Sequence, residues 1–106
     1  MEIYRGDTFK FDFTAVLEDG SLYEFQVGDI VKVGIKNKIT NPKCGMLKVI
    51  NIEEATDTLQ VTFSHEEMKK TCLGDKLLEV ELTRNNGDVI TLYQDKITIV
   101  GDVINE

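Results

Sequence analysis

Hydrophobic and polar residues alternate along most of this chain, which is the pattern of β-strands. The clearest run is Thr8–Thr14, in which Phe9, Phe11 and Phe13 alternate with polar residues. Successive side chains on a strand point to opposite faces, so the three phenylalanines share one apolar face. This run predicts a strand over Thr8–Leu17 that lines the centre of a hydrophobic core.

The same alternation recurs down the chain, and Gly, Asn and Asp residues separate the runs as they do in antiparallel β domains. Further strands are predicted at Ile30–Lys36, Met46–Ile52, Leu59–Phe63, Lys76–Arg84 and Val89–Tyr93, with a short apolar segment at Leu22–Phe25. After Gln94-Asp95 the last strand either continues or re-forms at Lys96–Val100. The inward-facing residues are expected to be Val31, Val33, Ile35, Leu59, Val61, Phe63, Leu78, Val80, Leu82, Ile97 and Ile99. Asn86-Gly87 predicts a hairpin, and Asn37–Gly45, with the only proline, predicts an exposed loop.

One segment, near residues 64–72, has the signals of a helix. Ser64 and Glu67 have the spacing of a capping box, in which each side chain satisfies a backbone N–H of the first turn. Gly74 ends the segment after about two turns. We expect this short helix to be a crossover between strands.

These elements predict an all-β fold with six to seven strands and one short crossover helix in a single domain, residues 1–106. The expected architecture is an antiparallel β-sandwich, immunoglobulin-like, without the tryptophan and paired core cysteines of antibody domains. A five-stranded barrel is the main alternative.

Composition narrows the classes of partner. Of the 106 residues, 42% are hydrophobic and 29% are charged, with a formal net charge of −7. An acidic surface repels phosphate backbones and anionic lipids, so we expect neither nucleic acid nor membrane as a partner. The chain has no apolar run of about 20 residues and no signal peptide at its start, which predicts a protein made in the cytoplasm or exported without such a signal.

No residue pattern indicates catalysis or metal binding. His65 is the only histidine, and no nucleophile with a recognisable turn accompanies it. Cys44 and Cys72 do not form a CxxC pair and cannot complete a zinc site with one histidine. We expect two free structural thiols, although spacing alone leaves a disulfide between them open. The prediction is a protein that is not an enzyme and uses no metal or cofactor.

Three weaker patterns have simpler explanations. Arg5-Gly6-Asp7 spells a tripeptide that adhesion receptors read, but at a strand entry it predicts a turn. Asp-Gly and Gly-Asp pairs provide oxygens that calcium could use, yet they are scattered and predict turns. Tyrosines could stack on sugars, but packing within or at the edge of the fold is the expected role of Tyr4, Tyr23 and Tyr93.

Taken in order, several motifs make the chain resemble the N-terminal domain of phage baseplate upper proteins and related phage tail modules. They are Arg5–Phe9 opening a strand, the Glu18–Gly20 turn, the strand Gly28–Lys36, the connection Thr62–Gly74 and the strand Leu77–Leu82. The similarity covers nearly the whole chain and consists mainly of turns and alternation.

The resemblance implies a non-catalytic structural module that docks into a phage or prophage particle, with other phage structural proteins as partners and a homo-oligomeric state. Lys36, Lys38 and Lys43 are basic residues in and beside the predicted loop of an acidic chain, and they are the candidate contact surface. The competing hypothesis is a β-sandwich module that binds carbohydrate or a cell-surface polymer.

Overall fold

Strands make up nearly all of the regular structure in the computed structural model, which describes residues 1–37 and 45–101. The elements are β1 (Glu2–Tyr4), β2 (Phe9–Phe13), β3 (Ile30–Asn37), β4 (Met46–Asn51), β5 (Leu59–Phe63), α1 (His65–Lys69), β6 (Gly74–Thr83) and β7 (Val89–Val100). The predicted all-β class is confirmed.

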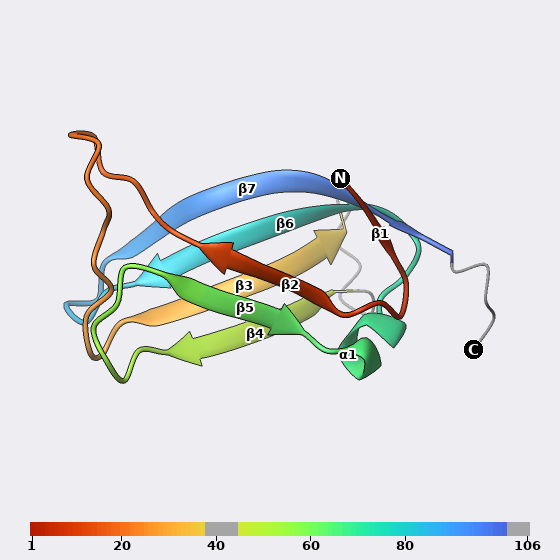
Figure 1. The fold of residues 1–106 in the computed structure, drawn as a ribbon, viewed down its shortest axis with the longest axis horizontal. Helices are drawn as coiled ribbons and strands as arrows, with labels where there is room; N and C mark the ends of the chain where they lie inside the picture. Colours follow the sequence, from red (N-terminus) through yellow and green to blue (C-terminus); the bar gives the residue numbers. More distant parts are fainter. Residues whose placement is uncertain (38–44, 102–106) are drawn as a thin grey trace.

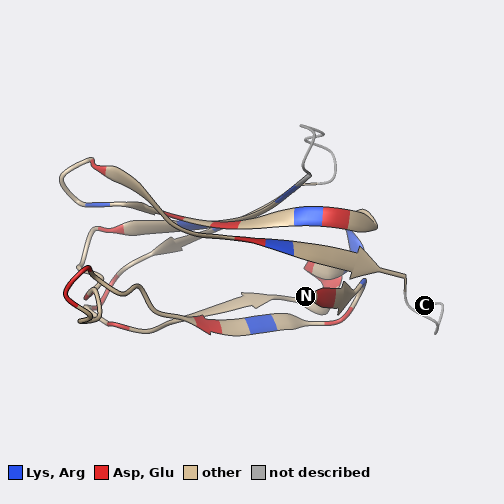
Figure 2. Cartoon of the chain, turned by 90° about the horizontal axis from the view of Figure 1, so that it is seen from above, with Lys and Arg blue, Asp and Glu red and all other residues tan. Residues whose placement is uncertain are grey.

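The strands form two layers of unequal width. One sheet has five strands in the order β1-β7-β6-β3-β4, and the other contains only β2 and β5 (Figure 1). Seen from above, the two sheets are separate layers with the interior between them (Figure 2). The helix α1 joins β5 to β6 and so carries the chain from the narrow layer to the wide one.

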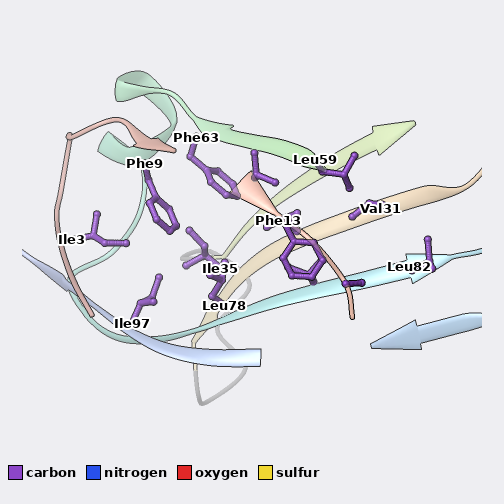
Figure 3. Close-up of a cluster of buried hydrophobic side chains, with 14 of the residues drawn as sticks. Ile3, Phe9, Phe13, Val31, Ile35, Leu59, Phe63, Leu78, Leu82 and Ile97 are labelled. Atoms are coloured by element: carbon purple, nitrogen blue, oxygen red, sulfur yellow. The ribbon is translucent and has the colours of Figure 1, made fainter. Parts of the chain in front are cut away.

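The core lies between the layers and consists of the side chains that alternation predicts. Val31, Val33 and Ile35 of β3 are fully buried, and Phe63 and Val80 are equally inaccessible. Leu59, Val61, Leu78, Leu82, Ile97 and Ile99 are also buried. Figure 3 shows side chains of both layers pointing toward one another across this interior. Every predicted inward-facing residue is therefore confirmed.

The phenylalanine-rich strand lies in the narrow layer and is shorter than predicted. Phe9 and Phe13 are buried and Phe11 is half-buried, while β2 pairs only with β5. Beyond Phe13 the chain forms a tight turn, in which the Leu17 N–H donates to Ser21 O. A positive φ of 88° at Gly20 closes that turn, which is the conformation that glycine adopts at little cost. The predicted strand over Thr8–Leu17 therefore ends early.

The five-stranded sheet is mixed, so the prediction of an antiparallel arrangement is wrong at one edge. β1 pairs with β7 in parallel, with Ile3 opposite Ile99. Between β1 and β2, Asp7 N–H donates to Tyr4 O in a turn with Gly6 at φ 93°. The turn places β2 in the other layer. Three residues are too few to show alternation, which is why β1 has no signal in the sequence.

β6 and β7 form the predicted hairpin, and β7 is one continuous strand. Its turn has the Gly87 N–H donating to Arg84 O and the Arg84 N–H donating to Asp88 O. The sequence leaves open whether this strand continues or re-forms after Gln94-Asp95, and in the structure it continues. The register between β6 and β7 shifts two residues before Gln94, where Val80 faces Tyr93 and Glu81 faces Thr91. Leu92 is the extra residue of this β-bulge.

The helix has the predicted capping box and is shorter than residues 64–72. Glu67 N–H donates to Ser64 Oγ at 3.1 Å, and Ser64 N–H donates to Glu67 Oε1 at 3.0 Å. Lys48 of β4 also donates to Glu67 Oε1 at 2.8 Å. These hydrogen bonds, from Lys48 first and then from Ser64, hold the pKa of Glu67 below its usual range. The side chains of Lys48 and Glu67 are both partly exposed.

We expect the substitution Ser64→Ala to lower the free energy of unfolding by about 1 kcal/mol, because the Glu67 N–H of the first helical turn loses its acceptor, the Ser64 Oγ. Urea denaturation at neutral pH measures this loss. Glu66→Gln is the matched control, since Glu66 lies in the same turn and makes no capping contact. Equal effects of the two substitutions would contradict the capping role.

Candidate functional site

An open groove of about 400 Å³ lies along residues 90–93 of β7. Its lining comes from residues 13–18, which follow β2, from residues 90–93 of β7, and from Tyr23, Leu82 and Arg84. We call this feature the β7 groove. Most of its lining is apolar, which distinguishes it from the charged surface elsewhere.

The groove exists because a two-stranded layer cannot cover a five-stranded one. Leu82 of β6 is 1% exposed, whereas its neighbour Ile90 on β7 is 42% exposed. Likewise Val80 is fully buried while its partner Tyr93 is 41% exposed. Residues on β7 that face the interior side of the sheet therefore remain open to solvent where no strand lies over them.

The bulge at Leu92 determines how the β7 side of the groove is built. Leu92 is half-buried and packs against the core. The Tyr93 ring meets the Phe13 ring edge-on at a centroid distance of 6.0 Å. Its hydroxyl donates to Asp95 Oδ2 at 3.1 Å. Burial first, and then Asp95, raise the pKa of Tyr93, so the phenol stays protonated at neutral pH.

The opposite side of the groove is the chain that follows β2. Val16 and Leu17 are 66% and 46% exposed there, so this side of the groove presents aliphatic surface to solvent. Tyr23 N–H donates to Ala15 O at 2.7 Å, and Val16 forms an isolated bridge with Leu22. The short apolar segment Leu22–Phe25 pairs only through such isolated bridges, the second one between Phe25 and Thr56. Its residues still hold the segment next to β7.

A buried carboxylate fixes the geometry of this end of the molecule. Asp29 is 1% exposed. Its Oδ2 accepts hydrogen bonds of 2.9 Å from the Tyr23 hydroxyl and from the Gln26 N–H, and its Oδ1 accepts one of 3.0 Å from the Asn85 N–H. Burial raises the pKa of Asp29, but the three hydrogen bonds outweigh it and the pKa is lowered overall. Asp29 thus ties the segment between β2 and β3 to the β6–β7 hairpin.

Tyr23 is the second aromatic residue of the groove, and both ends of its side chain are held. Its ring packs edge-on against Phe25 at 5.1 Å, and the Arg84 guanidinium lies 6.0 Å from the ring centroid. Burial and then Asp29 raise the pKa of the Tyr23 hydroxyl. Tyr23 is therefore a rigid part of the lining.

Backbone groups of β7 border the groove without a strand partner. β6 pairs with one edge of β7 throughout, whereas β1 pairs with the other edge only at Thr98–Val100. Within residues 1–37 and 45–101, no backbone group hydrogen-bonds to that second edge between Val89 and Lys96. An exposed strand edge beside an apolar groove is a ready site for a protein partner.

Of the predicted contact lysines, only Lys36 lies in the described part of the chain, and it does not line the β7 groove. Lys36 lies on the outer face of the five-stranded sheet, where its Nζ forms a 3.0 Å ion pair with Glu79. That contact lowers the pKa of Glu79, with help from Gln94. Lys38 and Lys43 lie outside the described residues, as does most of the predicted loop Asn37–Gly45.

The other motifs of the sequence take structural places. Nδ1 of His65 is in hydrogen-bonding contact with the Gly6 carbonyl oxygen, which fastens the turn after β1 to α1. Cys72 is disulfide-bonded, so the prediction of a free thiol is wrong there, because sequence spacing does not show which cysteines approach. Cys44 lies outside the described residues.

Neither a metal-binding cluster nor a membrane-spanning helix is present in the part of the chain that the structure describes. Residues 1–37 and 45–101 contain no group of three or more His, Cys, Asp or Glu side chains placed to hold a metal ion. In the same part of the chain, no helix has the length and hydrophobicity needed to span a bilayer.

Sequence reasoning missed the residues that make the groove. Ile90 belongs to a predicted strand, but alternation does not show whether a strand face is covered. Val16 and Leu17 have a weak signal, because two adjacent aliphatic residues immediately before the turn signal Glu18-Asp19-Gly20 break the alternation. Asp29 was interpreted only as part of a Gly-Asp turn.

Comparison with known proteins gives no relative on which a function could be based. No family model matches the chain, and no curated protein matches it. The functional argument therefore depends on the geometry described above and on the motifs of the sequence.

Proposed function

We propose that this protein is a non-catalytic assembly module of a phage or prophage particle, of the tail or baseplate type, that acts through protein–protein contacts. The observation that carries the proposal is the β7 groove, an apolar surface next to an unpaired strand edge. Surfaces of this kind are costly in an isolated chain and are typical of interaction sites.

The motifs that resemble phage tail modules are the reason for assigning the module to a phage particle. In this view the two layers are an immunoglobulin-like β-sandwich, and the partners are other phage structural proteins. The module works as a homo-oligomer, in the virion or in the host cytoplasm, and without a cofactor. The symmetric contact between copies uses a surface other than the β7 groove, for example the outer face that carries Lys36.

Co-expression with the structural proteins encoded beside it tests this proposal. We expect the chain to co-purify with at least one of them in a defined stoichiometry and to form oligomers by light scattering at high concentration. A strictly monomeric protein that recovers none of those neighbours would contradict the proposal.

Carbohydrate binding is the alternative, and one observation favours it. Two of the three tyrosines, Tyr23 and Tyr93, line the same groove. Aromatic rings of this kind stack on sugar faces. The alternative predicts a specific hit in a glycan panel that Tyr93→Ala removes. Tyr4→Ala is the matched control, because Tyr4 is 47% exposed and lies outside the groove.

A further inference from the structure

The unpaired edge of β7 specifies the kind of chain that can occupy the groove. In the hairpin, Arg84 N–H donates to Asp88 O, so the backbone groups of Arg84 point toward β7. Bonded and non-bonded pairs alternate in an antiparallel ladder, which makes Leu82 and Ile90 a bonded pair. The neighbouring pair, which contains Val89, is then a non-bonded one. The N–H and C=O of Val89 therefore point away from β6, to the free edge of β7. Only an extended backbone can pair with a strand edge over several residues.

The side chains of the groove set the pattern of apolar residues in that segment. Ile90 and Tyr93 present apolar surface on the interior side of β7, opposite Val16 and Leu17. A strand added to β7 would point every second side chain into this space. Its inward residues must therefore be apolar, and a groove of about 400 Å³ accommodates a small number of them.

The acidic residues around the groove determine which charge the bound segment should carry. Acidic residues are concentrated at the end of the molecule where the β6–β7 hairpin lies, and Figure 2 shows several of them on its connections. They include Glu18, Asp19, Glu53, Glu54, Asp57 and Asp88. Glu18 belongs to the groove lining, and Asp88 directly precedes β7. The only basic residue of the groove lining, Arg84, lies over the Tyr23 ring.

A second copy of the chain fits this surface poorly. With a net charge of −7, it would bring acidic residues against acidic residues, which disfavours association. A segment with basic residues on its solvent side is attracted by the same charges. The occupant is therefore a partner of different composition.

We propose that the β7 groove binds an extended segment of a partner protein, in which apolar and basic residues alternate, as an added strand on β7 in line with β1. The assignment of the partner to a phage particle rests on the proposed function, whereas the mode of binding rests on the groove and its free edge. The added strand would widen the five-stranded sheet and cover Ile90 and Tyr93.

A peptide of ten residues with alternating valine and lysine is the direct probe. We expect it to bind at low salt about tenfold more tightly than the matched valine–glutamate peptide, and to weaken as salt rises. A block peptide of five valines followed by five lysines controls for composition and charge. Amide hydrogen exchange followed by NMR should show new protection at Val89 and its neighbours on β7. Absence of binding, equal binding of the block peptide, or protection elsewhere would overturn the proposal.

Two pairs of variants separate backbone pairing from side-chain contact. Ile90→Asp should weaken peptide binding at least about tenfold, whereas Val49→Asp should leave it unchanged. Val49 is 49% exposed on β4, at the opposite edge of the same sheet. Val89→Pro removes the outward N–H, and Val89→Ala retains it, so only the proline variant should lose affinity. A folded Val89→Pro protein that binds normally would contradict strand addition.

Co-assembly with neighbouring structural proteins distinguishes this proposal from the proposed function. If the wild-type chain co-assembles and Ile90→Asp does so equally well, the strand-addition proposal fails and the assembly role stands. If the peptide protects β7 but no particle protein binds, the strand-addition site stands and the assembly role fails.

Discussion

The substitution Phe63→Ala should lower the free energy of unfolding by about 3–5 kcal/mol, the largest effect that we expect from a single change. Phe63 is fully buried, and its ring stacks on that of Phe9 at a centroid distance of 6.1 Å. Lys48 Nζ lies 5.4 Å from the same centroid. The alanine variant leaves a cavity between the layers, because the narrow layer has only one neighbouring strand with which to close it.

Thermal and urea denaturation measure this loss, and a fall in the melting temperature of about 10–20 °C is expected. Phe11→Ala is the matched control. Phe11 lies on the same pair of strands but is only half-buried, so its loss should be clearly smaller. If both substitutions cost the same, the interior does not lie where the structure places it. Because small domains are stable by about 5–15 kcal/mol, Phe63→Ala should leave a narrow margin of stability.

The second large effect is expected at Asp29. The substitution Asp29→Ala removes the acceptor of the Tyr23 hydroxyl and of the Gln26 and Asn85 N–H groups. Buried donors without partners are costly, and we expect a loss of about 2–4 kcal/mol at neutral pH. The segment between β2 and β3 should also loosen from the hairpin. Faster amide exchange at Asn85 would report this change.

The same residue makes stability depend on pH in a defined direction. The folded-state pKa of Asp29 lies below its ordinary value of 3.8. Its contribution is therefore complete above that ordinary value and is lost as the pH falls through the folded-state pKa. The free energy of unfolding, measured by urea denaturation, should differ most between wild type and Asp29→Asn at pH 6–7, and the difference should shrink progressively below about pH 4.

Other carboxylates titrate in the same range, so the comparison between variants is needed. The pKa values of Asp19, Glu67 and Glu79 are also lowered, in each case with a hydrogen bond to the carboxylate as the first cause. They contribute equally to wild type and variant and cancel in the difference. Asp12→Asn, at an exposed position on β2, is the control that should leave the free energy of unfolding at neutral pH unchanged. A difference between wild type and Asp29→Asn that stays constant down to pH 2 would contradict the role of the charged form.

Local signals in the sequence were sufficient for most individual elements. Val31, Val33 and Ile35 alternate with polar or small residues, and this period is a property of the strand itself. The Ser64–Glu67 capping box and the Asn86-Gly87 hairpin also depend on residues that are neighbours in the chain. These predictions therefore agreed with the structure.

The errors arose where pairing joins distant parts of the chain. β1 is a strand only because β7 offers an edge almost a hundred residues away in the sequence, and its parallel direction follows from the turn at Gly6. The continuity of β7, which the sequence leaves open, depends on its ladder with β6, and a bulge at Leu92 preserves that ladder. Alternation within a segment contains no information about such partners.

The sequence by itself therefore determined the class of the fold, the strands with a clear period and the residues of their inward faces. Only the tertiary structure decided how many strands each layer receives. That number leaves Ile90 and Tyr93 uncovered, with Val16 and Leu17 on the other side of the groove. The tertiary structure also buries Asp29, whose hydrogen bonds join distant segments. Whether an apolar face is covered depends on the area of the opposite layer, and no local pattern along the chain records that area.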